Sequence, residues 1–302
     1  MQLATQCPAC GGRRFRSRKA TIAPFVAQRI WQSEPFDTEL LVCRDCTLAF
    51  YRLRPDDSEM SRLYDDYRGQ SYQRQRQIYE SDYTAELNAS LGGELNILVR
   101  RAYLGSLLDH WADLAEVATV LDYGGDRGQF IPAELEHSRR YVYEISGVEP
   151  IEGVIPLHSI EDVLELEPDL VLCSGVLEHV ADPKQVVELL GTVGNGDTLF
   201  YFELPLDSPV PNYVGQLEMD AGFLSRAKAR VKSIPPVYSN DLRLRRAKIT
   251  WIKPSMHEHI NYFSKRSLHM MLTRSGFRVE HLCTAVLDLT IGDVRVMSCL
   301  AR

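Results

Sequence analysis

The chain has 302 residues, of which 45% are hydrophobic and 25% charged, as is usual for a globular protein. Its net charge of −7 argues against a general nucleic-acid binder, and no apolar run is long enough to span a membrane. The N-terminus lacks the basic and apolar regions of a signal peptide, so we expect a cytoplasmic protein.

Two CxxC pairs lie near the start of the chain, CPACGG at 7–12 and CRDC at 43–46. Each pair presents two thiolates on a tight turn, and two such turns complete the four-sulfur shell of a structural zinc ion. The segments between the pairs predict short strands, so we interpret residues 1–54 as a zinc ribbon, with a redox role as the alternative. The expected zinc ligands are Cys7, Cys10, Cys43 and Cys46.

Residues 55–93 are polar and rich in tyrosine, and they are predicted to connect the ribbon to the rest of the chain. Two interpretations stay open. The tyrosines pack on neighbouring helices, or they form a lid over a pocket, where each supplies a rigid face and a hydroxyl. The stretch YDDYRGQSY predicts a loop, because Gly69 is the only glycine between the ribbon and Gly92.

Residues 94–302 alternate between helical and strand patterns, which predicts a doubly wound, mostly parallel α/β sheet. Helices are expected at 94–114, 129–138, 184–193 and 264–277, the last with Ser264 as N-cap and Gly276 past its end. Strands are expected at 118–125, 143–150, 153–159, 169–175, 197–205, 277–286 and 293–301.

A basic segment at 224–253 interrupts this pattern with nine Lys and Arg and one acidic residue. We interpret it as an insertion. It either contacts an anionic substrate or partner, or it is an exposed arm without a ligand.

The stretch VLDYGGDRGQF at 120–130 has the features of a nucleotide-binding turn between a strand and a helix. The first strand delivers Asp122 to the carboxyl edge of the sheet, and Gly124, Gly125 and Gly128 let the backbone approach a ligand. Glu149, expected at the tip of the second strand, is placed to take the hydroxyls of a ribose. Dinucleotide enzymes share this arrangement, so NAD competes as the cofactor, although NAD sites usually have the pattern GxGxxG. No P-loop lysine is present, which argues against ATP.

Four stretches, LDYGGDRGQF, GVEP, DLVLCSGVLEHVADP and EHINYFSKRSLHMMLTRSGF, resemble the motifs of class I S-adenosylmethionine-dependent methyltransferases over residues 95–302. The chain departs from that pattern at Asp126, where most members have a glycine. The resemblance implies a Rossmann-like seven-stranded methyltransferase sheet with S-adenosylmethionine as cofactor. It also implies the cofactor-binding residues Asp122, Gly124, Gly125, Gly128, Glu149, Pro150, Ser159, Ile160, Cys173 and Ser174.

The ribbon, the tyrosine-rich connector and the later Glu-His pair are together similar to C-methyltransferases of deoxysugar biosynthesis. That resemblance implies a nucleotide-linked keto sugar as acceptor and a histidine base. The expected catalytic residues are His259, Glu258 and His179, with His259 favoured as the base. The chain departs from these enzymes by the basic insertion and by ending after the seventh strand.

Two other functions remain open at this stage. Some rRNA and tRNA methyltransferases also have zinc ribbons, which the basic insertion favours and the acidic chain disfavours. The other is a non-catalytic scaffold that binds the cofactor. The acceptor atom and the oligomeric state are not predicted.

Overall fold

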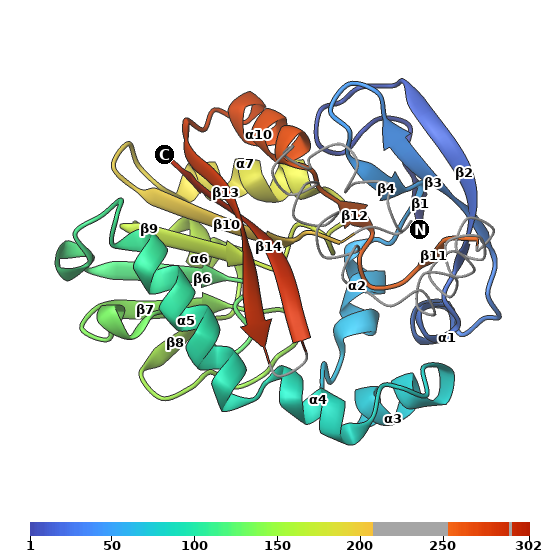
Figure 1. The fold of residues 1–302 in the computed structure, drawn as a ribbon, viewed down its shortest axis with the longest axis horizontal. Coiled ribbons are helices and arrows are strands. Elements are labelled where there is room, and N and C mark those ends of the chain that lie inside the picture. The colour runs from blue at the N-terminus through green and yellow to red at the C-terminus, as the bar shows by residue number, and fades with distance from the viewer. Residues whose placement is uncertain (208–252, 290–291) are drawn as a thin grey trace, which may run out of the picture.

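The computed structural model describes residues 1–207, 253–289 and 292–302, and it contains two main sheets joined by a helical connector (Figure 1). Most of the basic segment 224–253 therefore lies outside the described residues. None of the helices in the described ranges combines the length and apolar character needed to cross a membrane.

The N-terminal sheet has five strands in the order β11-β2-β3-β4-β12. Its central strands β2 (Phe15–Ile22), β3 (Asp37–Cys43) and β4 (Ala49–Tyr51) pair antiparallel, and the short strands β1 (Gln2–Leu3) and β5 (Leu53–Arg54) pair beside them. The expectation of strands alone is wrong here, because helix α1 (Pro24–Trp31) follows β2. Proline fits the first turn of a helix, where its missing N–H has no partner to lose.

The two edge strands of this sheet come from the far end of the sequence. β11 (Ser255–Met256) pairs parallel with β2, and β12 (Asn261–Tyr262) pairs antiparallel with β4. The segment MHEHINYF thus leaves one edge of the N-terminal sheet and joins the other, which holds its two histidines at a defined place.

Three helices form the connector, α2 (Asp57–Tyr64), α3 (Gln70–Tyr79) and α4 (Ala85–Leu91). Asp56 is the N-cap of α2 and forms a capping box with Glu59. The Asp56 side chain accepts from the Glu59 backbone N–H, and the Glu59 carboxylate accepts from the Asp56 backbone N–H. Residues 65–69 separate α2 from α3, so the loop expected at Gly69 is confirmed.

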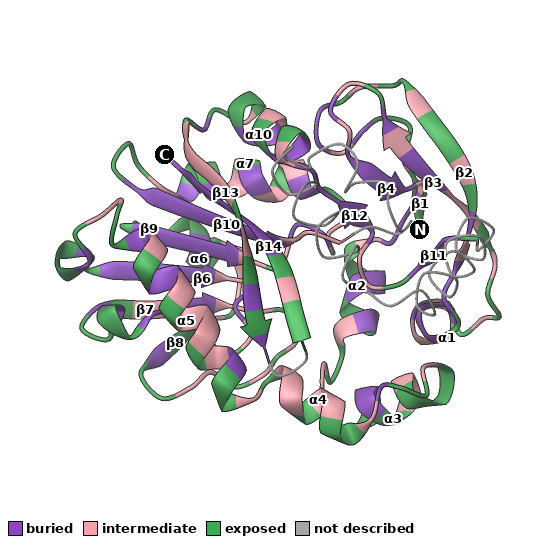
Figure 2. Cartoon of the chain, viewed as in Figure 1, coloured by how far each residue is buried: buried purple, intermediate pink, exposed green. Residues whose placement is uncertain are grey.

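The second sheet has seven strands in the order β13-β14-β10-β9-β6-β7-β8, which confirms the expected α/β fold. Five strands run parallel, and β14 pairs antiparallel with both β10 and β13. The bounds are β6 (Thr119–Tyr123), β7 (Arg139–Tyr143), β8 (Val154–Leu157), β9 (Leu170–Ser174), β10 (Leu199–Pro205), β13 (Val279–Leu289) and β14 (Gly292–Ala301). Figure 2 shows the central strands β6, β9 and β10 of this sheet largely buried.

The helices around this sheet are α5 (Glu94–Leu108), α6 (Ile160–Leu164), α7 (Pro183–Val193) and α10 (Lys265–Arg274), with 3₁₀ turns η1 (Leu114–Glu116) and η2 (Ala133–Leu135). The helix expected at 129–138 is wrong, because only η2 forms there. Pro132 keeps the residue before it out of a helical conformation, and β7 begins at Arg139, so only a short turn fits between them. Ser264 caps α10 as predicted, with Oγ accepting from the Ser267 N–H at 3.1 Å.

A shared core joins the N-terminal sheet to the seven-stranded sheet. Cys7, Cys43 and Phe50 belong to the same buried cluster as Met271 of α10 and Phe202 of β10. Thr47 Oγ1 also lies 2.6 Å from the Ser264 hydroxyl that caps α10. The N-terminal module is therefore packed against the sheet rather than held by a linker alone.

Candidate active site

The candidate site lies at the carboxyl edge of the parallel strands, where β6, β7, β9 and β10 all end. In a doubly wound fold this edge is where ligands bind, because the loops that follow the strands diverge there. Residues after each of these four strands supply the polar groups described below.

The glycine turn after β6 closes tightly around Asp122. A Cβ atom at Gly125 would lie 2.1 Å from the Asp122 carboxyl carbon, and one at Gly124, where φ is +70°, would lie 2.5 Å from Val176 Cγ2. Burial, followed by the charges of Glu144 and Asp126, raises the pKa of Asp122 to about 7. Asp122 Oδ2 is buried and has no hydrogen-bond partner among the described residues, so this turn can still accept a donor from a ligand.

The acid at the tip of the second strand is Glu144, which corrects the expected strand boundary. β7 ends at Tyr143, and the Glu144 carboxylate accepts hydrogen bonds from the backbone N–H groups of Asp126 at 3.1 Å and Ser146 at 2.9 Å. Glu149 is exposed and lies farther along the loop, where its carbonyl oxygen accepts from Arg127 Nε at 3.0 Å. A carboxylate that faces the glycine turn is therefore supplied by Glu144.

The other residues expected around a cofactor lie along the same edge in different roles. The Ser159 hydroxyl caps α6 by accepting from the Asp162 N–H at 3.1 Å, and Ile160 begins that helix. Pro150 lies in the loop before β8, Cys173 is buried in the core, and Ser174 ends β9 half-buried.

The segment after β9 carries Glu178 and His179. Burial raises the pKa of Glu178 to about 7, against the lowering effect of the His259 charge, and Glu178 Oε2 has no hydrogen-bond partner in the described part of the chain. His179 Nδ1 lies 2.6 Å from the Tyr64 hydroxyl of α2 and 3.2 Å from the Glu258 carbonyl oxygen. Burial and then the His259 charge hold the pKa of His179 well below its usual value, so this imidazole is neutral.

His259 lies beside His179, with ring centroids 4.7 Å apart. His259 Nδ1 contacts Asp207 Oδ2 at 2.7 Å, just beyond the end of β10. Burial opposes a charge on His259, but the hydrogen bond with Asp207 and the charges of Glu178 and Asp207 outweigh it and raise the pKa of His259 to about 9. Ligand-type atoms of Glu178, His179 and His259 all lie within 4.8 Å of one another.

Glu258 belongs to a different group of contacts. Its carboxylate pairs with Arg76 of α3 at 2.9 Å and accepts from the Tyr72 hydroxyl. His257 is exposed, and its Nδ1 lies 3.2 Å from Glu80 Oε1. The structure thus brings His259 and His179 together and directs the Glu258 carboxylate into the connector. The connector helices α2 and α3 supply Tyr64 and Tyr72 to this region.

Three residues of this site were not predicted from the sequence: Glu144, Glu178 and Asp207. Glu178 precedes His179 inside the motif VLEHV, which could have identified it. Asp207 reaches His259 only through a tertiary contact, so no local pattern marks it. Tyr64 belongs to the tyrosine-rich connector that the sequence singled out, but its contact with His179 was not predicted.

The four cysteines of the N-terminal module converge in a second, buried cluster. Their Sγ atoms lie within 4.8 Å of one another, with Cys7 and Cys46 3.5 Å apart and Cys10 and Cys43 3.6 Å apart. Four thiolates around a tetrahedral zinc ion, at Zn–S distances of ~2.3 Å, would be separated by about 3.8 Å. The cluster has the ligand type and size that suit a structural zinc ion.

The fold is that of an α/β methyltransferase. A family model described as a methyltransferase domain matches residues 97–282, which is more than half of the chain. The chain belongs to this family.

Solved structures with a similar fold include several methyltransferases. The 1,6-didemethyltoxoflavin-N1-methyltransferase of Burkholderia thailandensis, solved with its substrate and S-adenosylhomocysteine, is 17% identical with a TM-score of 0.43 over 75% of this chain and 86% of its own. Mitomycin 7-O-methyltransferase MmcR is 16% identical with a TM-score of 0.40, over 81% and 66%. The N-terminal domain of EvdMO1, solved with S-adenosylhomocysteine and D-fucose, is 14% identical with a TM-score of 0.35, over 70% and 83%. No curated protein matches the chain significantly.

Proposed function

We propose that this protein is an S-adenosylmethionine-dependent methyltransferase for a small-molecule acceptor, with C-methylation favoured over O-methylation. One observation carries the proposal. At the carboxyl edge of the seven-stranded sheet, buried carboxylate oxygens of Asp122 and Glu178 have no hydrogen-bond partner in the described residues. Two histidines lie at the same edge. The pKa of His179 is lowered, so it is neutral, and the pKa of His259 is raised, so it favours the protonated form. Buried polar atoms are rarely left unpaired, so these are the atoms to which a ligand would bind.

The residues of the glycine turn suit the proposed cofactor. A partly ionised, buried Asp122 favours a cationic or hydrogen-donating group, and Glu144 keeps lone pairs for hydroxyl groups. S-adenosylmethionine, when bound, would supply an electrophilic methyl group on a sulfonium. We assign the ribose contact to Glu144 in place of Glu149.

The histidines are proposed to handle the proton of the acceptor. Val176 packs against Gly124 of the glycine turn and lies three residues before His179 in the chain, so the segment that carries His179 starts at this turn. His259, in its neutral form, takes a proton from the acceptor carbon. Asp207 then stabilises the imidazolium that results. His179, held by Tyr64 and kept neutral by burial, is placed to orient the acceptor. We propose a nucleotide-linked keto sugar as the acceptor class and a structural zinc ion at the four cysteines.

Calorimetry with S-adenosylhomocysteine tests the cofactor assignment. We expect the wild-type protein to bind, Glu144→Gln to weaken binding by about tenfold or more, and Glu149→Gln to leave it unchanged. The absence of binding by the wild type would contradict the proposal. Metal analysis of the purified protein should find one zinc per chain.

The acceptor chemistry has its own test. With a keto-sugar acceptor and S-adenosylhomocysteine in D₂O, proton abstraction exchanges the acidic C–H for deuterium without any methyl transfer, and His259→Ala should abolish that exchange. With S-adenosylmethionine in place of S-adenosylhomocysteine, an O-methylated product would contradict the carbon assignment.

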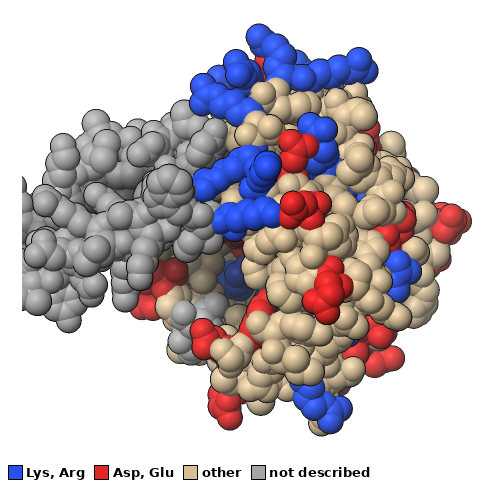
Figure 3. Space-filling model, turned by 90° about the vertical axis from the view of Figure 1, so that its right-hand side faces the viewer, with Lys and Arg blue, Asp and Glu red and all other residues tan. Residues whose placement is uncertain are grey.

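A nucleic-acid acceptor is the second candidate, because residues 1–54 carry nine Lys and Arg against four Asp and Glu. Figure 3 views the molecule from the right-hand side of Figure 1, and basic side chains gather toward the top of that face. RNA binding that weakens steeply with salt would favour this candidate.

A further inference from the structure

The loop between α2 and α3, residues 65–69, approaches the glycine turn and has an unusual backbone. Asp66 and Arg68 both adopt the left-handed region, with φ of 50° and 60°, which costs free energy for residues other than glycine. Local contacts maintain this conformation, since the Ser71 N–H donates to Asp66 Oδ2 at 2.9 Å and Asn88 Nδ2 donates to the Arg68 carbonyl oxygen at 2.8 Å. Such strain is common at sites that bind ligands.

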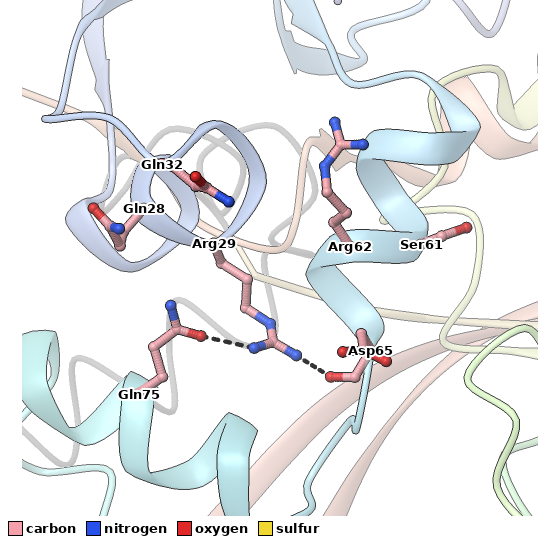
Figure 4. A pocket seen from close by; sticks show the side chains of 7 residues that line it. All are labelled: Gln28, Arg29, Gln32, Ser61, Arg62, Asp65 and Gln75. Carbon is pink, nitrogen blue, oxygen red and sulfur yellow. Dashed lines mark hydrogen bonds between the residues drawn. The ribbon is translucent and has the colours of Figure 1, made fainter.

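The N-terminal module fixes the start of this loop through Arg29. A polar pocket of about 500 Å³ lies beside α1. Figure 4 shows that the Arg29 side chain extends from α1 into this pocket, between α2 and α3. Arg29 Nε donates to the Leu63 carbonyl oxygen at 2.8 Å, Nη1 donates to Gln75 Oε1 at 2.7 Å, and Nη2 donates to the Asp65 carbonyl oxygen. The groups lining this pocket therefore bond to one another and hold the loop in place.

The Arg68 side chain is incompletely paired. Its Nη1 lies 3.9 Å from Asp126 Oδ2, beyond hydrogen-bond distance, and Asp126 Oδ2 already accepts from Gln129 Nε2 at 2.8 Å. The guanidinium also interacts with the Tyr67 side chain, and its carbon lies 5.0 Å from the centre of that ring. Its Nε is buried without a hydrogen-bond partner in the described ranges. A guanidinium with an unpaired buried N–H beside a ligand-binding turn favours an anionic ligand, because its planar fork matches a carboxylate.

Two kinds of anion are candidates for binding to this guanidinium, one on the cofactor and one on the acceptor. The acidic side chain that lies 3.9 Å from Arg68 is that of Asp126, which belongs to the glycine turn that would hold the amino-acid end of the cofactor. That end carries the only carboxylate of S-adenosylmethionine. We propose that Arg68 binds this carboxylate, so that the connector completes the cofactor site. The inference rests on the proposed function.

Calorimetry with two ligands tests this assignment. S-adenosylhomocysteine has the carboxylate, whereas 5′-methylthioadenosine has the same nucleoside and thioether without the amino-acid end. We expect Arg68→Met to weaken S-adenosylhomocysteine binding by about 10- to 100-fold, the usual loss for a hydrogen bond to a charged group. The same change should leave 5′-methylthioadenosine binding within twofold, which also shows that the variant is folded. Arg74→Met, at an exposed position of α3, is the matched control and should affect neither ligand.

Other outcomes would overturn the inference. Equal losses for both ligands would give Arg68 a general structural role. Unchanged binding of both, with a raised KM for an anionic acceptor, would assign Arg68 to the acceptor. No binding of either ligand by the wild-type protein would instead contradict the proposed function itself.

Discussion

The two Glu-His pairs of this chain have the same two residues but opposite arrangements. In the first, the Glu178 carboxylate faces the site and His179 is kept neutral by burial. In the second, the Glu258 carboxylate is held by Arg76 and His259 is kept cationic by Asp207 and Glu178. A Glu-His dipeptide therefore does not by itself determine the role of its two residues. Burial keeps His179 neutral, whereas the hydrogen bond with Asp207 and the charges of Glu178 and Asp207 favour the protonated form of His259.

The largest expected effect comes from removing the cationic member of the histidine pair. His259→Ala should lower kcat by about 10²- to 10⁴-fold, the usual contribution of a positioned acid or base, while the Kd for S-adenosylhomocysteine stays within twofold. His257→Ala is the control, because that neighbouring side chain is exposed. Equal activity of the two variants would remove His259 from the mechanism.

A pH profile sharpens the contrast between the two histidines. Because the pKa of His259 is raised to about 9, its neutral form grows as pH rises towards that value, and kcat/KM should rise with pH below it. Asp207→Asn removes the hydrogen-bonded charge, so the rise should move to lower pH. The measurement is kcat/KM between pH 6 and 10 for both proteins. An unshifted midpoint would mean that a group other than His259 controls the rate.

The smallest expected effect concerns the neutral histidine. Tyr64→Phe removes the hydroxyl that lies 2.6 Å from His179 Nδ1, and kcat should fall by about two- to tenfold, as expected for one hydrogen bond. Tyr79→Phe is the control, since Tyr79 is 40% exposed. A loss as large as that of His259→Ala would reverse the ranking of the two histidines.

Local signals allowed much of the fold to be predicted. The strands at 118–125, 169–175 and 197–205 each contain adjacent apolar residues, which is typical of strands buried on both faces. Ser264 was predicted as an N-cap because its short side chain can accept from the first turn of a helix. Local signals place the ends of elements less precisely. The acid at the tip of β7 is Glu144, and only a 3₁₀ turn forms in the helix expected at 129–138.

Residues close together in the chain were enough to predict the alternation of strands and helices, the glycine turn and the two CxxC pairs, while the resemblance to class I methyltransferases implied the seven-stranded sheet. Only the tertiary structure decided which side chains meet. The pairing of β11 and β12 with the N-terminal sheet places His259 beside His179, and the ends of α2 and β10 supply Tyr64 and Asp207. These are contacts between distant segments, and their burial and charge set the protonation of each histidine.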